Sequence, residues 1–199
     1  MLRANGIERV VICVGYRGDQ IEDTLRREPP GLDVEVVSDG DRLLGTAGAL
    51  RAASAALGSA FFVLYGDSYL TCPFGPVQSA FEAANRLGLM TVYRNSGQFD
   101  RSNVVFRDGE ILVYDKRVQT PDMLHIDYGL GVLRTEALSR VPSDAPYDLA
   151  GLYAELLAEG ELAAYEVSER FYEIGSQEGI EDTRAYLETR AAAIAVEVR

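Results

Sequence analysis

Apolar runs of strand length alternate with segments of helix-spaced apolar residues through the first two thirds of the chain. The runs end at polar or turn-forming residues, which is typical of strands buried in a sheet. The predicted strands are 8–14, 33–39, 60–67 and 87–94, and the predicted helices between them are 17–28, 46–57 and 74–86. This alternation predicts an α/β fold with a Rossmann-like, doubly wound and mostly parallel sheet.

The pattern changes from residue 103 onward. SNVVFRDGEILVYDK predicts two short strands around the turn Asp108-Gly109, which favours a hairpin. The remaining predicted elements are a strand at 128–135, a short helix near 135–140, a helix at 147–159, strands at 161–167 and 170–174, and a C-terminal helix from 177 to about 194. Because no repeat or linker marks a second domain, we expect a single domain over residues 1–199.

Composition narrows the classes of function. Hydrophobic residues make up 47% of the 199 positions and charged residues 25%, as in an ordinary globular domain. The net charge of −12 argues against nucleic acid or an anionic membrane as a partner, so an anionic substrate needs a locally positive site. Cys13 and Cys72 lie in or just after apolar strands, which suits reduced thiols. With no signal peptide and no apolar run of membrane-spanning length, the sequence predicts a cytoplasmic protein.

One carboxylate stands out at the end of a predicted strand. FFVLYGDSYL at 61–70 is apolar until Gly66-Asp67. The carboxyl edge of a parallel sheet is where phosphate ligands bind, and a carboxylate there is suited to hold Mg²⁺ against a phosphate. Asp67 is therefore a candidate metal ligand, with a simple Gly-Asp turn as the alternative. His125 is the only histidine, which excludes a multi-histidine metal centre and predicts a surface loop residue.

Three blocks, taken in order, resemble the sugar-1-phosphate nucleotidyltransferase family and its smaller bacterial members. They are LLGTAGAL at 43–50, YGDSYL at 65–70 and RFYEIGSQEG at 170–179. No block is specific alone, but their order and spacing fit over nearly all of residues 1–185. The resemblance implies a sheet of the nucleotide-diphospho-sugar transferase type. It also implies an enzyme that joins a sugar 1-phosphate to a nucleoside triphosphate, releases pyrophosphate and uses Mg²⁺.

The resemblance also implies roles for individual residues. Asp67 and Glu173 would share one Mg²⁺, although the family often has Asp at the second position, and Lys116, the only lysine, would contact the sugar phosphate. The implied nucleotide-binding residues are Ser38, Gly45, Thr46 and Gly66, and the implied sugar-binding residues are Asn103, Asp115 and Asp127. From the residues alone, Thr46 is also a candidate helix N-cap, and Asn103 and Asp127 are common types of turn residue.

The sequence departs from the family at its beginning. The family opens with an apolar strand and a loop of the form GGxGTRLxPxTxxxPKP, which wraps the triphosphate, and no such motif is present in this sequence. Residues 1–14 resemble the end of the family's first helix followed by its second strand. We therefore expect an N-terminally incomplete domain that is inactive or weakly active as given. The strands at 8–14 and 60–67 should lack a shared neighbour, unless a second copy or a partner supplies one.

Two other functions stay open at this stage. A non-catalytic paralogue could bind a nucleotide sugar or act as a regulatory subunit of a partner. A nucleotide-sugar-dependent glycosyltransferase is a further alternative, but that class typically has two acidic residues separated by one at the strand end. Gly66-Asp67-Ser68 supplies a single acidic residue.

Overall fold

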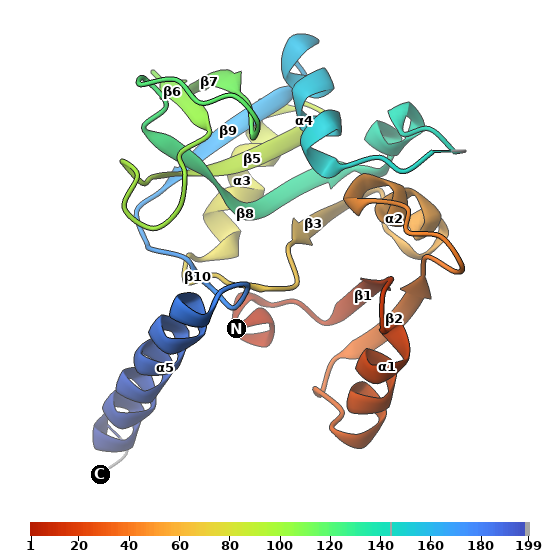
Figure 1. Cartoon of the computed structure of the whole chain (residues 1–199), viewed down its shortest axis with the longest axis vertical. Coiled ribbons are helices and arrows are strands. Elements are labelled where there is room, and N and C mark those ends of the chain that lie inside the picture. Colours follow the sequence, from red (N-terminus) through yellow and green to blue (C-terminus); the bar gives the residue numbers. More distant parts are fainter. Residues whose placement is uncertain (144, 198–199) are drawn as a thin grey trace.

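The structure, a computed structural model, describes residues 1–143 and 145–197 (Figure 1). The helices are α1 (Gly18–Arg27), α2 (Thr46–Ala52), α3 (Phe74–Ala84), α4 (Leu149–Ala158) and α5 (Gln177–Glu197), with short 3₁₀ helices at Leu2–Asn5, Ser54–Ala56 and Thr135–Arg140. The strands are β1 (Arg9–Val14), β2 (Asp33–Ser38), β3 (Ala60–Leu64), β4 (Ser68–Tyr69), β5 (Gly88–Arg94), β6 (Val104–Arg107), β7 (Glu110–Tyr114), β8 (His125–Arg134), β9 (Leu162–Val167) and β10 (Tyr172–Glu173). The predicted α/β alternation and the 103–115 hairpin are confirmed.

The central sheet is mixed, which corrects the expectation of mostly parallel strands. Its order is β7-β6-β8-β5-β9, with β3 also paired to β8. The pairs β3/β8, β5/β8, β6/β8 and β6/β7 are antiparallel, and β5/β9 is parallel. The alternation of elements correctly indicated β3-α3-β5 as a crossover unit, but it could not show that β8 returns from the hairpin and inserts between those two strands without a crossover helix.

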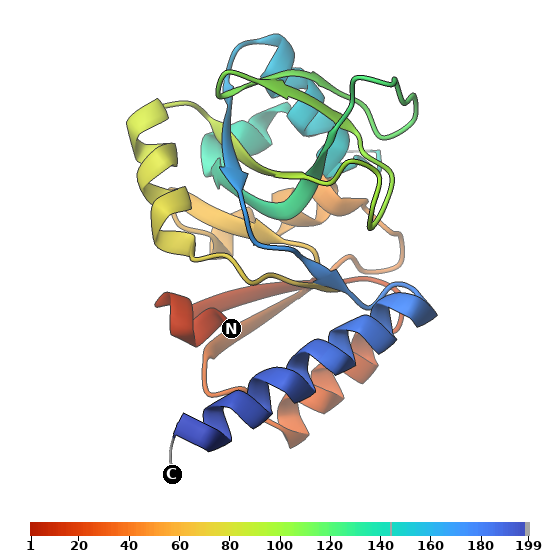
Figure 2. The ribbon, with the colours of Figure 1, turned by 90° about the vertical axis from the view of Figure 1, so that its left-hand side faces the viewer.

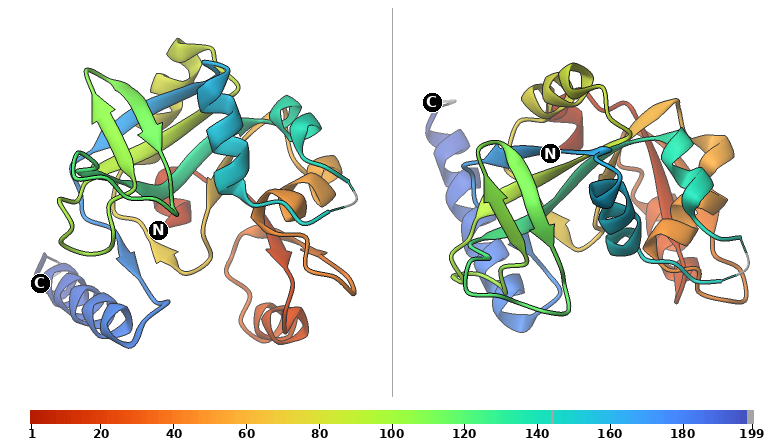
Figure 3. Two further views of the ribbon diagram at one scale, coloured as in Figure 1. Left: turned by 45° about the horizontal axis from the view of Figure 1, so that its top comes forward. Right: turned by 90° about the horizontal axis from the view of Figure 1, so that it is seen from above.

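Two apolar clusters cover the two faces of this sheet. Neighbouring residues of β5 point to opposite faces, so Leu89 packs with the α3 side chains Val77 and Phe81, while Met90 packs with α4. Figure 3 shows α3 and α4 on opposite sides of the strands. Gly131 of β8 is required by this packing, because a β-carbon there would collide with the buried Tyr153 hydroxyl of α4. The core therefore fixes β8, the strand that carries part of the candidate site.

The first two strands form a separate sheet. β1 and β2 pair in parallel through α1, and within the described residues neither is hydrogen-bonded to β3. Val10, Val11, Ile12 and Cys13 of β1 are only half-buried, as expected for a strand whose second edge is open. We expected the strands at 8–14 and 60–67 to lack a shared neighbour, and this is confirmed among the described residues, where β1 pairs with β2 and β3 pairs with β8 (Figure 1).

Helix α5 runs below the central sheet, away from α3 and α4 (Figure 2). It is attached near its middle, where the ring of Tyr186 stacks on Tyr172 of β10 with centroids 4.3 Å apart. Among the helices of the described residues, none combines the length and apolar character needed to cross a bilayer.

His125 is not the surface loop residue that the sequence suggested. It begins β8 with 8% of its surface exposed, its ring packs against Phe106, and its Nε2 lies 2.9 Å from Glu166 Oε1. The strand starts three residues earlier than the sequence indicated, because the polar residues of this segment are buried within the sheet.

Candidate functional site

Asp67 and Glu173 lie close together, as the family resemblance implied. β4 and β10 pair antiparallel with Glu173 opposite Ser68, and the Ile174 N–H donates to the Asp67 carbonyl at 2.9 Å. A β-carbon built on Gly175 would lie 2.9 Å from Glu173 Oε2 and 3.4 Å from Asp67 Oδ2. The two carboxylate oxygens can therefore be no farther apart than the sum of these distances. We call Asp67 and Glu173 the carboxylate pair.

The two carboxylates differ in how they are held. Asp67 is exposed, and its Oδ1 accepts a long hydrogen bond of 3.3 Å from the Ser68 hydroxyl. Glu173 folds back toward the start of α5, where it accepts from the Gly175 N–H at 2.5 Å and from the Ser176 hydroxyl at 2.7 Å. Because a carboxylate has about four lone-pair sites, both groups keep acceptor capacity for a further ligand.

The two carboxylates suit a Mg²⁺ ion that also keeps water or phosphate ligands. Among the described residues, no group of three or more His, Cys, Asp or Glu side chains is arranged to hold a metal. Mg²⁺ does not need such a cage, since it is commonly bound through one or two carboxylates together with waters and substrate phosphates. The carboxylate pair meets this requirement.

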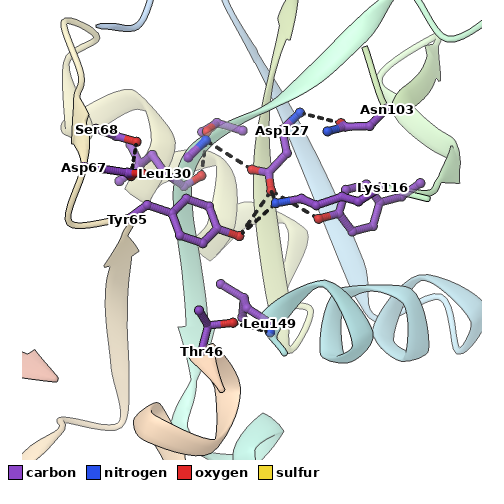
Figure 4. A network of polar contacts seen from close by, with 12 residues as sticks. Thr46, Tyr65, Asp67, Ser68, Asn103, Lys116, Asp127, Leu130 and Leu149 are labelled. Carbon is purple, nitrogen blue, oxygen red and sulfur yellow. Dashed lines mark hydrogen bonds and ion pairs between the residues drawn. The ribbon is translucent and has the colours of Figure 1, made fainter. Parts of the chain in front are cut away.

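A second cluster surrounds the buried carboxylate of Asp127, whose side chain is 3% exposed. Its Oδ2 lies 3.2 Å from Lys116 Nζ and accepts from the Tyr114 hydroxyl at 3.2 Å and from the Tyr65 hydroxyl at 3.4 Å. Its Oδ1 accepts from the Gly129 N–H at 3.1 Å. Figure 4 shows the ammonium of Lys116 directed at Asp127 and Tyr65.

Asn103 completes this group from the start of the hairpin. Its side-chain oxygen accepts from the Asp127 N–H at 3.0 Å, and its own N–H donates to the His125 carbonyl at 2.9 Å. The structure thus brings together Asn103, Lys116 and Asp127, which come from the hairpin and the start of β8. With Tyr65 and Tyr114 they form what we call the Lys116 cluster.

Asp115 lies beside this cluster, but its carboxylate is directed elsewhere. Its Oδ1 accepts from the Arg117 N–H at 2.7 Å and the Val118 N–H at 2.9 Å. The hydrogen bond from the Val118 N–H, followed by that from the Arg117 N–H, holds the pKa of the Asp115 carboxyl below its ordinary value. Asp115 therefore shapes the turn that presents Lys116, and it meets Asn103 through its backbone N–H, which donates to the Asn103 carbonyl at 3.0 Å, and not through its carboxylate.

The start of α2, where the nucleotide-binding candidates Gly45 and Thr46 lie, packs closely against the segment before α4. The N–H groups of Ala47 and Gly48 both donate to the Tyr147 carbonyl, at 2.9 and 3.0 Å. Gly45 has φ of +74°, and a β-carbon there would lie 2.7 Å from that same carbonyl oxygen. The close approach that glycine permits is therefore used by the protein's own backbone.

Thr46 is likewise occupied, and it does not cap its own helix. Gly45 is the N-cap of α2, and the Thr46 hydroxyl accepts from the Leu149 N–H of α4 at 2.7 Å. The other two nucleotide-binding candidates are more open. Ser38 ends β2 and accepts from the Gly40 N–H at 3.2 Å, and Gly66 is exposed with no atom within 4 Å of the place where a β-carbon would stand.

Tyr65 and Tyr114 are the members of the Lys116 cluster that sequence reasoning missed. Burial, and then the nearby Asp127 carboxylate, raise the pKa of both phenols far above the ordinary value, so both are hydrogen-bond donors at neutral pH. The Lys116 ammonium also lies 4.8 Å from the centre of the Tyr65 ring. The available signal was position, since Tyr65 stands two residues before Asp67 and Tyr114 two residues before Lys116.

Solved nucleotidyltransferases share this arrangement of elements. A protein from Bacillus anthracis, assigned as a glucose-1-phosphate thymidylyltransferase and solved with sucrose, superposes with a TM-score of 0.77 at 16% identity, over 93% of this chain and 78% of its own. HddC from Yersinia pseudotuberculosis gives a TM-score of 0.74 at 19% identity, over 91% and 79%. The inositol-1-phosphate CTP transferase from T. maritima gives 0.71 at 22% identity, over 89% and 74%.

The chain has the fold of these nucleotidyltransferases. No family model matches the sequence. At identities of 16–22% the similarity shows the shared fold, which agrees with the type of sheet expected from the sequence. What the chain does with this fold depends on the residues at its site.

Proposed function

We propose that this domain binds a nucleoside triphosphate and a sugar 1-phosphate and serves nucleotidyl transfer between them. The observation that carries this proposal is that one turn joins the carboxylate pair to the Lys116 cluster. The Ser68 N–H donates to the Tyr65 carbonyl at 3.2 Å, so the segment that carries Asp67 also presents the Tyr65 hydroxyl to Lys116. One short segment therefore carries a candidate metal-binding carboxylate and also contacts the Lys116 ammonium, which suits two substrates whose phosphates must meet.

The carboxylate pair would hold Mg²⁺, which when bound neutralises phosphate charge during transfer. The remaining task of the protein is to position the two substrates relative to each other. Lys116 would hold the phosphate of the sugar so that one of its oxygens faces the α-phosphorus of the triphosphate in line. A new oxygen–phosphorus bond forms there as the bond to pyrophosphate breaks, and no covalent protein intermediate is needed.

On the nucleotide side, two of the four predicted residues keep open surroundings. Gly66 allows a phosphate to approach the backbone beside Asp67, because no side chain stands there. Ser38 ends β2 with an exposed hydroxyl. Gly45 and Thr46 would act by fixing the backbone of their loop through Tyr147 and Leu149, which supports a base-binding loop built from the segment before α2.

Three further parts of the proposal follow from the sequence. Since no GGxGTRL-type motif is present, transfer by residues 1–199 alone should be slow or absent, with substrate binding as the more robust property. A second copy or a partner would supply a strand between β1 and β3. Cys13 and Cys72 are free thiols, which suits a reducing cytoplasm.

The Mg²⁺ dependence of nucleotide binding tests this proposal. We predict that Asp67→Asn lowers the Mg²⁺-dependent affinity for nucleoside triphosphate at least about tenfold, while the melting temperature stays close to that of the wild type because Asp67 is exposed. Titration calorimetry with dTTP, CTP, GTP and ATP, with and without Mg²⁺, measures the first effect. Pyrophosphate release with a panel of sugar 1-phosphates measures any residual transfer.

Asp108→Asn is the matched control. It makes the same chemical change at an exposed hairpin position whose φ of +52° suits asparagine, remote from the carboxylate pair. Undiminished Mg²⁺-dependent binding in a well-folded Asp67→Asn protein would contradict the metal role. A wild-type protein that binds none of the four nucleotides would contradict the proposed function as a whole.

A further inference from the structure

The carboxylate of Asp127 is nearly saturated by the protein itself. Lys116, Tyr65 and Tyr114 all approach its Oδ2, and the Gly129 N–H donates to its Oδ1. Each carboxylate oxygen offers about two lone-pair sites, so the three groups at Oδ2 leave it no free site, while Oδ1 keeps about one. With 3% of its side chain exposed, Asp127 has little surface left for a sugar hydroxyl.

Lys116 is in the opposite situation. Its ammonium carries three N–H donors, of which one is directed at Asp127 and one at the Tyr65 hydroxyl at 3.3 Å. Among the described residues it has no other hydrogen-bond partner, and 39% of its side chain is exposed. One N–H therefore stays available to an anion, while the other two and the Tyr65 ring fix where that N–H points.

We propose that Asp127 is a positioning residue, a buried counter-ion that fixes Lys116 for the phosphate of the incoming sugar 1-phosphate without contacting the sugar. This inference rests on the proposed function and assigns Asp127 a different role from the sugar contact that the sequence suggested. Tyr65 bridges the pair, since its hydroxyl accepts from Lys116 and donates to Asp127. The geometry is that of a clamp built before any substrate arrives.

The charge of Asp127 separates the two roles considered for it, which are to position Lys116 and to contact the sugar. Asp127 carries a negative charge next to the place where the phosphate would bind, so it holds Lys116 in position but also opposes the anion. Removing that charge without changing the shape should strengthen phosphate binding and loosen Lys116. If Asp127 instead accepted hydrogen bonds from the sugar, the same change would weaken binding of the sugar 1-phosphate.

The position of Lys116 can be read directly, because it is the only lysine in the sequence. Protein labelled with ¹³Cε-lysine gives a single ε-methylene signal. We predict two inequivalent Hε protons in the wild-type protein without ligand, and one averaged shift in Asp127→Asn. Asp108→Asn, the same change on the exposed hairpin turn, should keep the wild-type signal.

Titrations with inorganic phosphate and with glucose 1-phosphate then test the role of Asp127 in binding. The Lys116 signal reports the binding of both. We predict that Asp127→Asn tightens inorganic phosphate and glucose 1-phosphate by the same factor, about fivefold, since both meet only Lys116 at this point. Weaker glucose 1-phosphate binding with unchanged phosphate binding would overturn the inference, because Asp127 would then contact the sugar. A single averaged Hε shift in the wild-type protein would also overturn the inference by itself, because Lys116 would then not be fixed.

A second substitution covers the case in which Asp127→Asn does not fold. Tyr65→Phe keeps the ring under the ammonium and removes the bridging hydroxyl, so the Hε protons should move part of the way toward averaging. An unchanged Lys116 signal in Tyr65→Phe would contradict the clamp. These readouts are separate from nucleotide binding at Asp67, so a failure of the clamp and a failure of the proposed function give different results.

Discussion

At the scale of single residues, the burial of Asp127 decides the chemistry of its neighbours. A carboxylate that is 3% exposed must be neutralised or hydrogen-bonded, and here a lysine and two phenols do this. The sequence indicated Lys116, Asn103 and Asp127 through the family resemblance. For Tyr65 and Tyr114 it offered only their positions near Asp67 and Lys116, and a tyrosine before a turn is equally common as packing, so the fold is needed to show which hydroxyl reaches a buried charge.

Tyr114 provides a pH-dependent test of this burial. Its pKa in the folded protein is raised above the ordinary 10.0, so the unfolded chain loses the proton first and stability falls as pH rises through 10 toward the folded value. We predict that Tyr114→Phe lowers the free energy of unfolding by about 1–2 kcal/mol at pH 8, because Asp127 loses a donor. Above pH 10 the difference from wild type should shrink.

Urea denaturation monitored between pH 8 and 11 measures this difference. Tyr16→Phe is the control, since 77% of Tyr16 is exposed. The loss of its hydroxyl should leave the free energy of unfolding unchanged both at pH 8 and above pH 10. A constant difference between wild type and Tyr114→Phe across this range would show that the phenol of Tyr114 is not held in its protonated form.

At the scale of elements, sequence periodicity predicted most helices and strands but not the partners of each strand. The alternation of residues 60–94 gave β3, α3 and β5, while β8 had no signal for its place between them, because pairing partners are set by long-range packing. Gly45 of LLGTAGAL, a nucleotide-binding candidate, permits a close backbone approach whose partner within the protein the sequence could not indicate. The approaching group is the Tyr147 carbonyl, whose segment lies about 100 residues away in sequence.

The open edge of β1 leads to an element-scale prediction. β1 pairs only with β2 among the described residues, whereas the amides of β5 and β8 lie in the core of the central sheet. We predict that residues 9–14 exchange amide hydrogens about 100-fold faster than residues 88–92, a difference of about 2.7 kcal/mol in local opening. Fusion of a family-type GGxGTRL segment should slow this exchange and raise the melting temperature.

Hydrogen-exchange mass spectrometry resolves these segments. The exchange rates of β2 provide an internal reference, since it shares the small sheet with β1. Equal protection of 9–14 and 88–92 in the unfused monomer would contradict the open-edge interpretation, and so would a fused segment that leaves residues 9–14 unaffected.

At the scale of the whole molecule, the fold joins two functional groups that lie far apart in sequence. Antiparallel pairing of β4 with β10 places Glu173 beside Asp67, and the hairpin and β8 place Lys116 against Tyr65. The turn at 65–68 belongs to both groups. We therefore propose that a metal ion held by the carboxylate pair lies next to Lys116, the only lysine of the sequence.

Paramagnetic broadening of the Lys116 signal tests this claim most directly. Mn²⁺ uses the same hard oxygen ligands as Mg²⁺ and broadens nearby nuclei. In protein labelled with ¹³Cε-lysine and saturated with nucleotide, we predict that Mn²⁺ broadens the single Lys116 signal, that excess Mg²⁺ restores it, and that Asp67→Asn abolishes the effect. A Lys116 signal that stays sharp with Mn²⁺ bound, or equal broadening in Asp67→Asn, would contradict the claim.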